Sequence, residues 1–257
     1  MRKVFKNIIS LLLAFSFLGL FFLFSLALNS KGNPPILYLR FDEGRGNIVY
    51  DSSENKFQGT IYGALWKNEE FCKVGKCLYF DGVDDYIDLG TILPIYSGGI
   101  TIEAWIKPTE IASGSRRFIL AKQKSDSGTT QYSLSLEPDS DEISFYYHAG
   151  SGALHQYTTK GADLKEGEWV HIALSFTFGD GSSIRIYKNG NLLNGNWVFG
   201  DGNSTAHSLS GWTNVYLNIG RKPYSSSGSY FSGFIDEIKI YDYPRTKSQI
   251  RAEYLSS

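Results

Sequence analysis

Four aspartates stand close together in the stretch FDGVDDYIDLG, which runs from Phe80 to Gly90. They are Asp81, Asp84, Asp85 and Asp88. Carboxylates gathered in this way can hold a hard cation, which takes oxygen ligands. Aspartates are also common in solvated turns, where the side chain bonds to the backbone of the bend. Strand-like runs flank the stretch on both sides, so the residues alone leave a cation site and a solvated turn open.

A further carboxylate stands out by its neighbours in FIDEIKIY, which starts at Phe234. Alternate side chains of a strand share a face, which groups Asp236 with Phe234, Ile238 and Ile240. An unpaired buried charge is very costly, so Asp236 needs hydrogen-bond donors, a basic partner or a metal ion. A bulge in the strand would instead rotate the carboxylate to the other face.

The elements that must position these carboxylates follow a separate N-terminal segment, residues 1–28. The run from Ile8 to Leu28 carries no charged residue, and about 20 apolar residues in a helix suffice to cross a bilayer. Basic residues precede this run and place the N-terminus in the cytoplasm and the remainder outside. They are Arg2, Lys3 and Lys6. The sequence predicts a retained single-pass membrane helix; the alternative is a signal peptide cleaved after Ala27, which would yield a secreted domain.

Cys72 and Cys77 are the two cysteines of the chain. Their C-x4-C spacing can begin a zinc site, but no second Cys/His pair follows at ligand spacing. In an exported domain, two cysteines this close predict a local disulfide bond that pins a hairpin.

The composition favours one exported β-domain over residues 36–257, joined by a linker at 29–35. Aromatic residues make up 15% of the chain, and glycine occurs 27 times, which is typical of all-β proteins. Basic and acidic residues number 25 and 26. That balance argues against a nucleic-acid surface, which needs a basic excess.

Short runs of alternating apolar and polar residues recur along this domain and predict a two-sheet antiparallel jelly-roll sandwich. Most are bounded by Gly, Asp, Ser or Asn. The runs are ILYLRF, ITIEAWIKP, FILAKQ, YSLSLE, EISFYYHA, WVHIALSF, IRIYKNG, VYLNIG and FIDEIKIY. Asn189-Gly190 predicts a tight type I′ hairpin. Thr246 and Gln249 form a capping box that begins one short C-terminal helix.

Aromatic residues offer a second kind of chemistry, because sugar rings stack on flat aromatic faces that also carry a polar edge. Those in strands, such as Trp105 and Trp169, are more typical of packing. Those in predicted loops are the candidate ligand-binding residues. They are Trp197, Trp212, Tyr224 and Tyr230.

Several motifs in order resemble the laminin-G-like jelly roll of the concanavalin A-like lectin/glucanase superfamily. They are FDEGRGN…DSSENKFQGTIYG, GKCLYFDGVDDYIDLG, ITIEAWIKPT, EWVHIALSF, IRIYKNG and FSGFIDEIKIYDYPRTKSQI. The resemblance covers the chain from about Ile36 to the C-terminus. It implies two antiparallel sheets with the first strand beside the last.

The resemblance also implies a structural calcium ion, held where this chain matches the acidic pattern of the family. The matching residues are Asp81 in FDG and Asp236 in IDE, with Asp42, Asp84 and Asp85 as lesser candidates. The alternative is that Asp81 only caps a turn and Asp236 accepts from backbone donors.

The predicted function is a non-catalytic binding module, tethered to the membrane and exposed outside, that recognises glycans or glycosylated surfaces. The alternative is a structural or adhesion protein of an envelope or virion that binds protein partners. A glycoside hydrolase needs two carboxylates facing one cleft. The candidates do not supply them, because Asp236 and Glu237 point to opposite faces and Asp139 to Glu142 is typical of a turn. No other catalytic motif occurs, so we expect no enzyme activity.

Overall fold

The computed structural model describes residues 32–257, except 112–113, 125–127, 207, 209–213 and 224–228. The chain divides into two units, Met1–Pro34 and Pro35–Ser257, and the described elements all lie in the second. The predicted membrane helix lies outside the described residues. Among the helices that the structure does describe, none has the length and apolar character needed to cross a bilayer.

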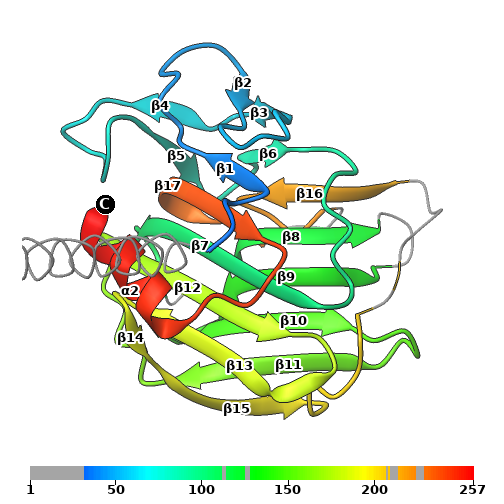
Figure 1. The fold of residues 1–257 in the computed structure, drawn as a ribbon. Helices are drawn as coiled ribbons and strands as arrows, with labels where there is room; N and C mark the ends of the chain where they lie inside the picture. Colours follow the sequence, from blue (N-terminus) through cyan, green and yellow to red (C-terminus); the bar gives the residue numbers. More distant parts are fainter. Residues whose placement is uncertain (1–31, 112–113, 125–127, 207, 209–213, 224–228) are drawn as a thin grey trace, which may run out of the picture. The chain divides into compact units, whose positions relative to one another are not determined.

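Two antiparallel sheets make up the second unit (Figure 1). The eight-stranded sheet has the order β14 (Asn191–Leu192), β13 (Asp180–Lys188), β12 (Val170–Thr177), β7 (Gly99–Pro108), β17 (Ser232–Tyr241), β5 (Cys77–Asp81) and β4 (Leu65–Lys67), with β1 (Leu37–Leu39) paired to β17. The nine-stranded sheet has the order β15 (Asn194–Phe199), β11 (Leu154–Lys160), β10 (Ile143–His148), β9 (Thr130–Leu136), β8 (Arg117–Lys124), β16 (Val215–Ile219), β6 (Tyr86–Asp88), β3 (Gln58–Tyr62) and β2 (Ile48–Tyr50). The predicted all-β sandwich, with its first strand beside its last, is confirmed.

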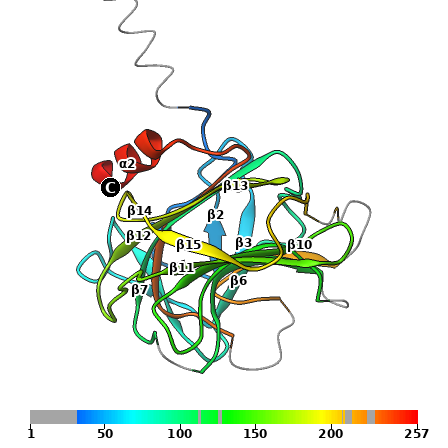
Figure 2. The same ribbon diagram turned by 90° about the horizontal axis from the view of Figure 1, so that it is seen from below.

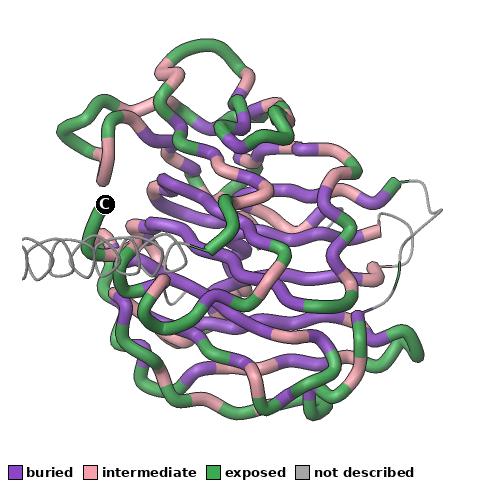
Figure 3. The backbone as a smooth tube through the Cα atoms, viewed as in Figure 1, coloured by how far each residue is buried: buried purple, intermediate pink, exposed green. Residues whose placement is uncertain are grey.

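The sheets lie face to face, and their inner faces enclose one aliphatic and aromatic core. In β12, Ile172 and Leu174 point into this core, as the alternation predicts. Ala173 points to the outer face, where it packs against Tyr187 of β13 and against Ile250 of helix α2 (Lys247–Ser256). Figure 2 shows α2 on the outer side of the eight-stranded sheet. Figure 3 shows burial concentrated in the strands and exposure in the connections.

Both local signals read from the sequence are present in the structure. Asn189 and Gly190 have φ angles of 50° and 71°, and they join β13 to β14 as a two-residue hairpin. Thr246 caps α2, and the side chain of Gln249 accepts from the backbone of Thr246, which completes the capping box.

The predicted grouping of side chains in β17 is wrong because the strand contains a bulge. The register with β7 shifts after Asp236, and Glu237 adopts a left-handed φ of 53°. Beyond the bulge, Ile238 and Ile240 point into the core. Asp236 and Phe234 therefore lie on the outer face of the eight-stranded sheet, the second possibility that the sequence left open.

Candidate functional site

The four-aspartate stretch forms a tight acidic turn between β5 and β6. Asp81 Oδ1 accepts hydrogen bonds from the backbone nitrogens of Val83 (2.8 Å) and Asp84 (3.4 Å). Asp85 Oδ2 accepts from the backbone nitrogen of Asp81 at 2.8 Å. Ligand oxygens of Asp81, Asp84 and Asp85 all lie within 4.8 Å of one another. Two of these carboxylates are exposed, and Asp85 is buried.

The electrostatics of the acidic turn suit a cation. Burial raises the pKa of the Asp85 carboxyl, and the charges of Asp81 and Asp84 raise it further, against a backbone hydrogen bond that lowers it. Three oxygen donors on one short segment match the hard-ligand preference of Ca²⁺. A bound cation would remove the mutual repulsion of the three carboxylates. Asp81 caps the turn, which is one of the two possibilities that the sequence left open, and the carboxylate grouping keeps the cation site as a hypothesis.

Asp81 and Asp236, the two ligands expected to share an ion, are not brought together. β17 pairs with β5 so that Ser232 lies opposite Asp81. Asp236 lies four residues further along β17, a separation of roughly 13 Å at about 3.3 Å per residue. One ion cannot bridge that span.

Asp236 has backbone partners instead. Its Oδ2 accepts from the backbone nitrogens of Lys73 (3.2 Å) and Val74 (3.0 Å). The carboxyl is fully buried, and burial raises its pKa to about 8. Its Oδ1 has no hydrogen-bond partner among the described residues.

The predicted disulfide bond between Cys72 and Cys77 is confirmed. The segment that it closes lies over the outer face of the eight-stranded sheet. The Lys73 ammonium sits 4.1 Å from the centre of the Trp105 ring, and the indole nitrogen of Trp169 donates to the Phe71 carbonyl. The disulfide loop therefore covers Asp236 and makes this part of the face inaccessible to ligands.

A second group of buried ionisable side chains lies beneath α2. The guanidinium of Arg245 pairs with Glu103, which also lies 3.3 Å from His171. All three are more than nine-tenths buried. Arg245 also bonds to Glu253 of α2, so this cluster attaches the helix to the sheet. Glu103 is buried away from any substrate, and Glu253 is engaged in holding the helix, which argues against a catalytic role for this pair.

The predicted ligand-binding aromatics fall in different places. Trp197 lies in β15, where its indole nitrogen donates to the Gly181 carbonyl and its ring packs 5.8 Å from Phe176. Its ring is thus largely engaged in packing. Trp212 and Tyr224 lie outside the described residues. Tyr230 is half-buried, close to the acidic turn.

Arg117 ties Tyr230 to that turn. Its Nη1 donates to the carbonyls of both Tyr230 (3.0 Å) and Gly82 (3.3 Å). Its Nη2 pairs with Glu110 at 2.5 Å. Tyr230 also raises the pKa of the Tyr86 hydroxyl, a minor effect beside burial, which places the two residues near each other.

An aromatic group that the sequence reading missed lies next to the acidic turn, and we call it the tyrosine–arginine stack. Tyr62 of β3 pairs across the strands with Tyr86 of β6. Their ring centres are 4.6 Å apart and the rings are nearly parallel, at 11°. Arg221 covers the other side of Tyr86, 3.2 Å from its ring centre. Tyr62 is 46% exposed, and among the described residues its ring stacks on Tyr86 on one side and on no aromatic ring on the other.

The stack stands at one end of a polar row that crosses the outer face of the nine-stranded sheet. The strand registers place these residues side by side: Thr60, Asp88, Asn218, Ala121, Ser133, Tyr146 and Gln156. The row contains hydrogen-bonding groups and small side chains, with few aliphatic ones. Such a surface can bind a polar ligand. Within this row only the end near the stack is accessible, because the other five residues are buried: Asn218, Ala121, Ser133, Tyr146 and Gln156.

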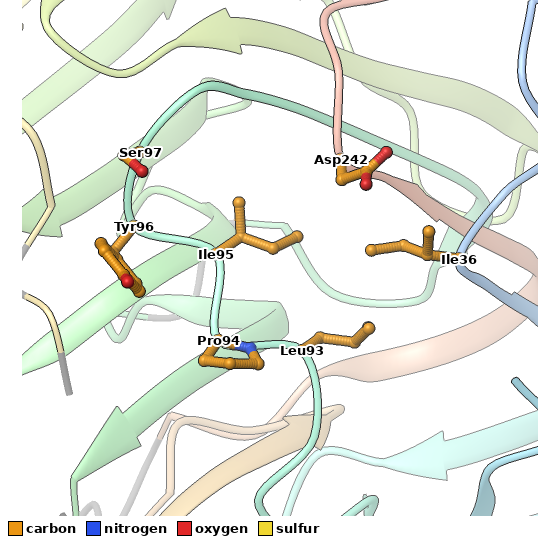
Figure 4. A pocket seen from close by; sticks show the side chains of 7 residues that line it. All are labelled: Ile36, Leu93, Pro94, Ile95, Tyr96, Ser97 and Asp242. Atoms are coloured by element: carbon orange, nitrogen blue, oxygen red, sulfur yellow. The ribbon is translucent and has the colours of Figure 1, made fainter. Parts of the chain in front are cut away.

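A separate pocket of about 390 Å³ opens at the rim of the sandwich (Figure 4). In Figure 4, Ile36 and Asp242 face the segment from Leu93 to Ser97 across it. Its lining combines apolar side chains with the polar residues Tyr96, Ser97 and Asp242. Ligand sites usually combine an apolar lining with several convergent polar groups. In Figure 4 the polar side chains lie on opposite sides, Tyr96 and Ser97 on one and Asp242 on the other, and do not converge on one point, so we assign no ligand to this pocket.

Comparisons with solved structures show the same fold at low identity. Domain 4 of AbnA, a GH43 extracellular arabinanase from Geobacillus stearothermophilus, in complex with arabinotriose, gives a TM-score of 0.61 at 19% identity, over 85% of this chain and 97% of that one. The receptor binding domain of botulinum neurotoxin D gives 0.63 at 11% identity, over 87% of this chain and 52% of that one. Trypanosoma rangeli sialidase gives 0.57 at 17% identity, over 87% of this chain and 33% of that one.

The chain thus spans nearly all of the AbnA domain, about half of the toxin domain and a third of the sialidase. No curated protein sequence matches it. A family model matches residues 81–251, which is more than half of the chain. The chain therefore belongs to the laminin-G-type family described as the concanavalin A-like lectin/glucanases superfamily.

Proposed function

We propose that this chain is a non-catalytic, surface-exposed module that binds glycans on the outer face of its nine-stranded sheet. The observation that carries the proposal is the tyrosine–arginine stack. An exposed tyrosine ring beside a polar row supplies the two contacts that sugars use, stacking on an aromatic face and hydrogen bonding to planar polar groups. The face opposite the stack, on the eight-stranded sheet, is covered by α2 and the disulfide loop.

Structures of similar fold support the proposal through what they bind. The AbnA domain is in complex with arabinotriose, and the toxin domain is a receptor binding domain. Fold similarity alone does not transfer a ligand, so the stack carries the argument and the neighbours add to it. The sialidase is an enzyme. In this chain the buried carboxylates near the helix and under the disulfide loop serve packing, which favours a binding role.

Two further features belong to the proposal. The acidic turn, through Asp81, Asp84 and Asp85, holds a structural Ca²⁺ that fixes the start of β6 and hence the position of Tyr86. The N-terminal segment anchors the module in the membrane, with the domain outside the cell. Both rest on the chemistry of the residues, an all-oxygen donor set and an uncharged run of bilayer length.

A glycan array tests the proposal directly. The full-length chain, purified in detergent, is applied to a broad array in calcium and again in chelator. Saturable binding to a defined set of glycans is the expected result, weakened in chelator. A blank array in both conditions would contradict the proposal.

The second candidate function is adhesion through a protein partner, and one observation favours it. β14 and β15 are the edge strands at one side of the two sheets, and they expose large apolar side chains. These are Leu192, Val198 and Phe199. Exposed apolar groups on unpaired edges can bind another protein. A blank array together with binding to an intact surface protein would favour this function.

A further inference from the structure

We propose that Tyr62, Asp88 and Arg221 form a saccharide subsite that takes a neutral glycan of at least two sugar units. The inference rests on the proposed function and names its site and ligand class. Tyr62 provides the stacking surface. Asp88 and Arg221 provide the hydrogen bonds to a pair of neighbouring hydroxyls.

A buried amide holds the two charged groups in place. Arg221 Nε donates to Asn218 Oδ1 at 2.9 Å, and Asn218 Nδ2 donates to Asp88 Oδ1 at 3.1 Å. Asn218 is fully buried and therefore rigidly placed. Its amide uses its acceptor for one neighbour and its donor for the other, which fixes the positions of both. Gly90 also donates to Asp88 Oδ1, at 2.8 Å.

The bridge through Asn218 leaves polar atoms of Asp88 and Arg221 available to a ligand. Asp88 Oδ2 and the two Nη atoms of Arg221 have no hydrogen-bond partner within the part of the chain that the structure describes. Asp88 and Arg221 are both partly exposed. A carboxylate oxygen and a guanidinium edge together present an acceptor and donors. Two adjacent sugar hydroxyls match them, since one donates to the carboxylate and the other accepts from the guanidinium.

The stack sets the minimum size of the ligand. Tyr86 is covered on one face by Tyr62 and on the other by Arg221, so it supports the stack and has no free face. The open ring face is that of Tyr62, on the side away from Arg221. Because 4.6 Å and then 3.2 Å separate these layers, one sugar ring cannot lie on Tyr62 and also reach Arg221. The ligand must therefore span two or more units.

Charge selects a neutral glycan. Asp88 and Arg221 cancel each other, while the acidic turn lies beside the stack. Asp84 and Asp85 directly precede Tyr86. A Cβ atom at Gly63 would lie 1.8 Å from Asp85 Oδ1, so that carboxylate stands against the residue that follows Tyr62. A sugar acid placed on Tyr62 would meet these like charges, and the three carboxylates of the acidic turn stay net negative even with one divalent ion bound.

Binding titrations with matched variants test the subsite. The full-length chain is titrated with neutral oligosaccharides, arabinotriose among them, and with sialic-acid- or uronic-acid-bearing oligosaccharides. Tyr62→Ala, Asp88→Asn and Arg221→Ala should each weaken binding of the neutral ligand by about tenfold or more. Two control variants should bind like the wild type. Phe71→Ala removes a ring that is 45% exposed beside the disulfide loop, over the other sheet, and Arg185→Ala removes an exposed guanidinium that donates to backbone carbonyls of the described residues Ser182 and Ile184.

Melting temperatures of all variants establish that each one is folded. If the three subsite variants are folded and bind the glycan as tightly as the wild type, the subsite is overturned. The proposed glycan function then still stands. A preference for the acidic oligosaccharides overturns the ligand class. Binding of no saccharide by the wild type overturns the proposed function and the subsite together.

Discussion

Asp85 and Asp236 are both buried carboxyls with a raised pKa, but their surroundings give them different roles. Asp85 faces two exposed carboxylates in the acidic turn, where a cation can offset the repulsion. Asp236 accepts hydrogen bonds from two backbone N–H groups of the disulfide loop. It lies too far from Asp81 to share an ion with it. The first is thus a candidate ligand, and the second is a carboxyl whose pKa burial raises to about 8.

The acidic turn predicts a calcium-dependent melting temperature. The wild-type chain should melt several degrees higher in calcium than in chelator, because an ion bound only by the folded state stabilises it. Asp84→Ala should abolish the difference, since it removes a ligand without removing the Asp81 turn cap. Asp139→Ala, in a turn elsewhere, is the control and should keep the full response. Equal melting of the wild type in calcium and in chelator would contradict the calcium proposal.

Asp236 predicts a loss of stability as the pH rises. Burial raises the pKa of this carboxyl to about 8, whereas an aspartate in the unfolded chain titrates near pH ~3.9. Between these values the folded state binds more protons, so the free energy of unfolding falls from about pH 4 to about pH 8. Urea unfolding at pH 5, 7 and 9 measures the slope. Asp236→Asn should flatten it and Asp242→Asn, at an exposed site, should not; an unchanged slope in Asp236→Asn would refute the assignment.

At the scale of elements, the disulfide loop and α2 make the outer faces of the two sheets different. Each covers part of the outer face of the eight-stranded sheet, the loop through Lys73 and Phe71 and the helix through Ile250. The corresponding face of the nine-stranded sheet keeps an exposed end at Tyr62. The covered face contributes stability, and the partly open face is the one on which we propose that a ligand binds.

Removing the disulfide bond tests this view of the loop. Cys72→Ser with Cys77→Ser should lower the free energy of unfolding by about 2 kcal/mol, the chain-entropy value for so short a loop. Fluorescence of Trp105 should also change, because the Lys73 ammonium rests on its ring. Glycan binding should persist, since the stack lies on the other sheet. Loss of glycan binding in a folded double variant would show that the two faces are coupled.

The sequence predicted the strands that bury an aliphatic face, because their alternation is regular, as in β7 and β12. It missed β11 and β15, whose polar residues, such as the run HQYTTK, carry no such signal. It could not decide between a regular and a bulged β17, since the bulge at Glu237 depends on the partner strand. The stack was missed for the same reason. Tyr62 and Tyr86 become neighbours only through the pairing of β3 with β6, which no local pattern specifies.

At the scale of the whole molecule, the proposed arrangement is a sandwich held at a membrane surface, with one sheet presenting a glycan site. The motifs of the sequence identified the family, and their order specified the architecture. The ligand face depends on which outer surface stays uncovered, and only the folded structure shows that.

The proposed membrane anchor makes its own prediction. In cells that express the full-length chain, the protein should remain in the membrane pellet after carbonate extraction, because an uncharged run of this length inserts as a helix. Protease added outside the cells should digest the domain. A variant beginning at residue 29, expressed behind a cleavable signal, should be soluble. Release into the medium of a protein that lacks the N-terminal segment would show instead that the segment is cleaved.

The most direct test of the central claim is a glycan array that compares the wild-type chain with the double variant Tyr62→Ala and Arg221→Ala. The account predicts that the wild type binds a set of neutral oligosaccharides and that the folded double variant binds none of them. Identical binding by both proteins, or no binding by the wild type, would contradict it.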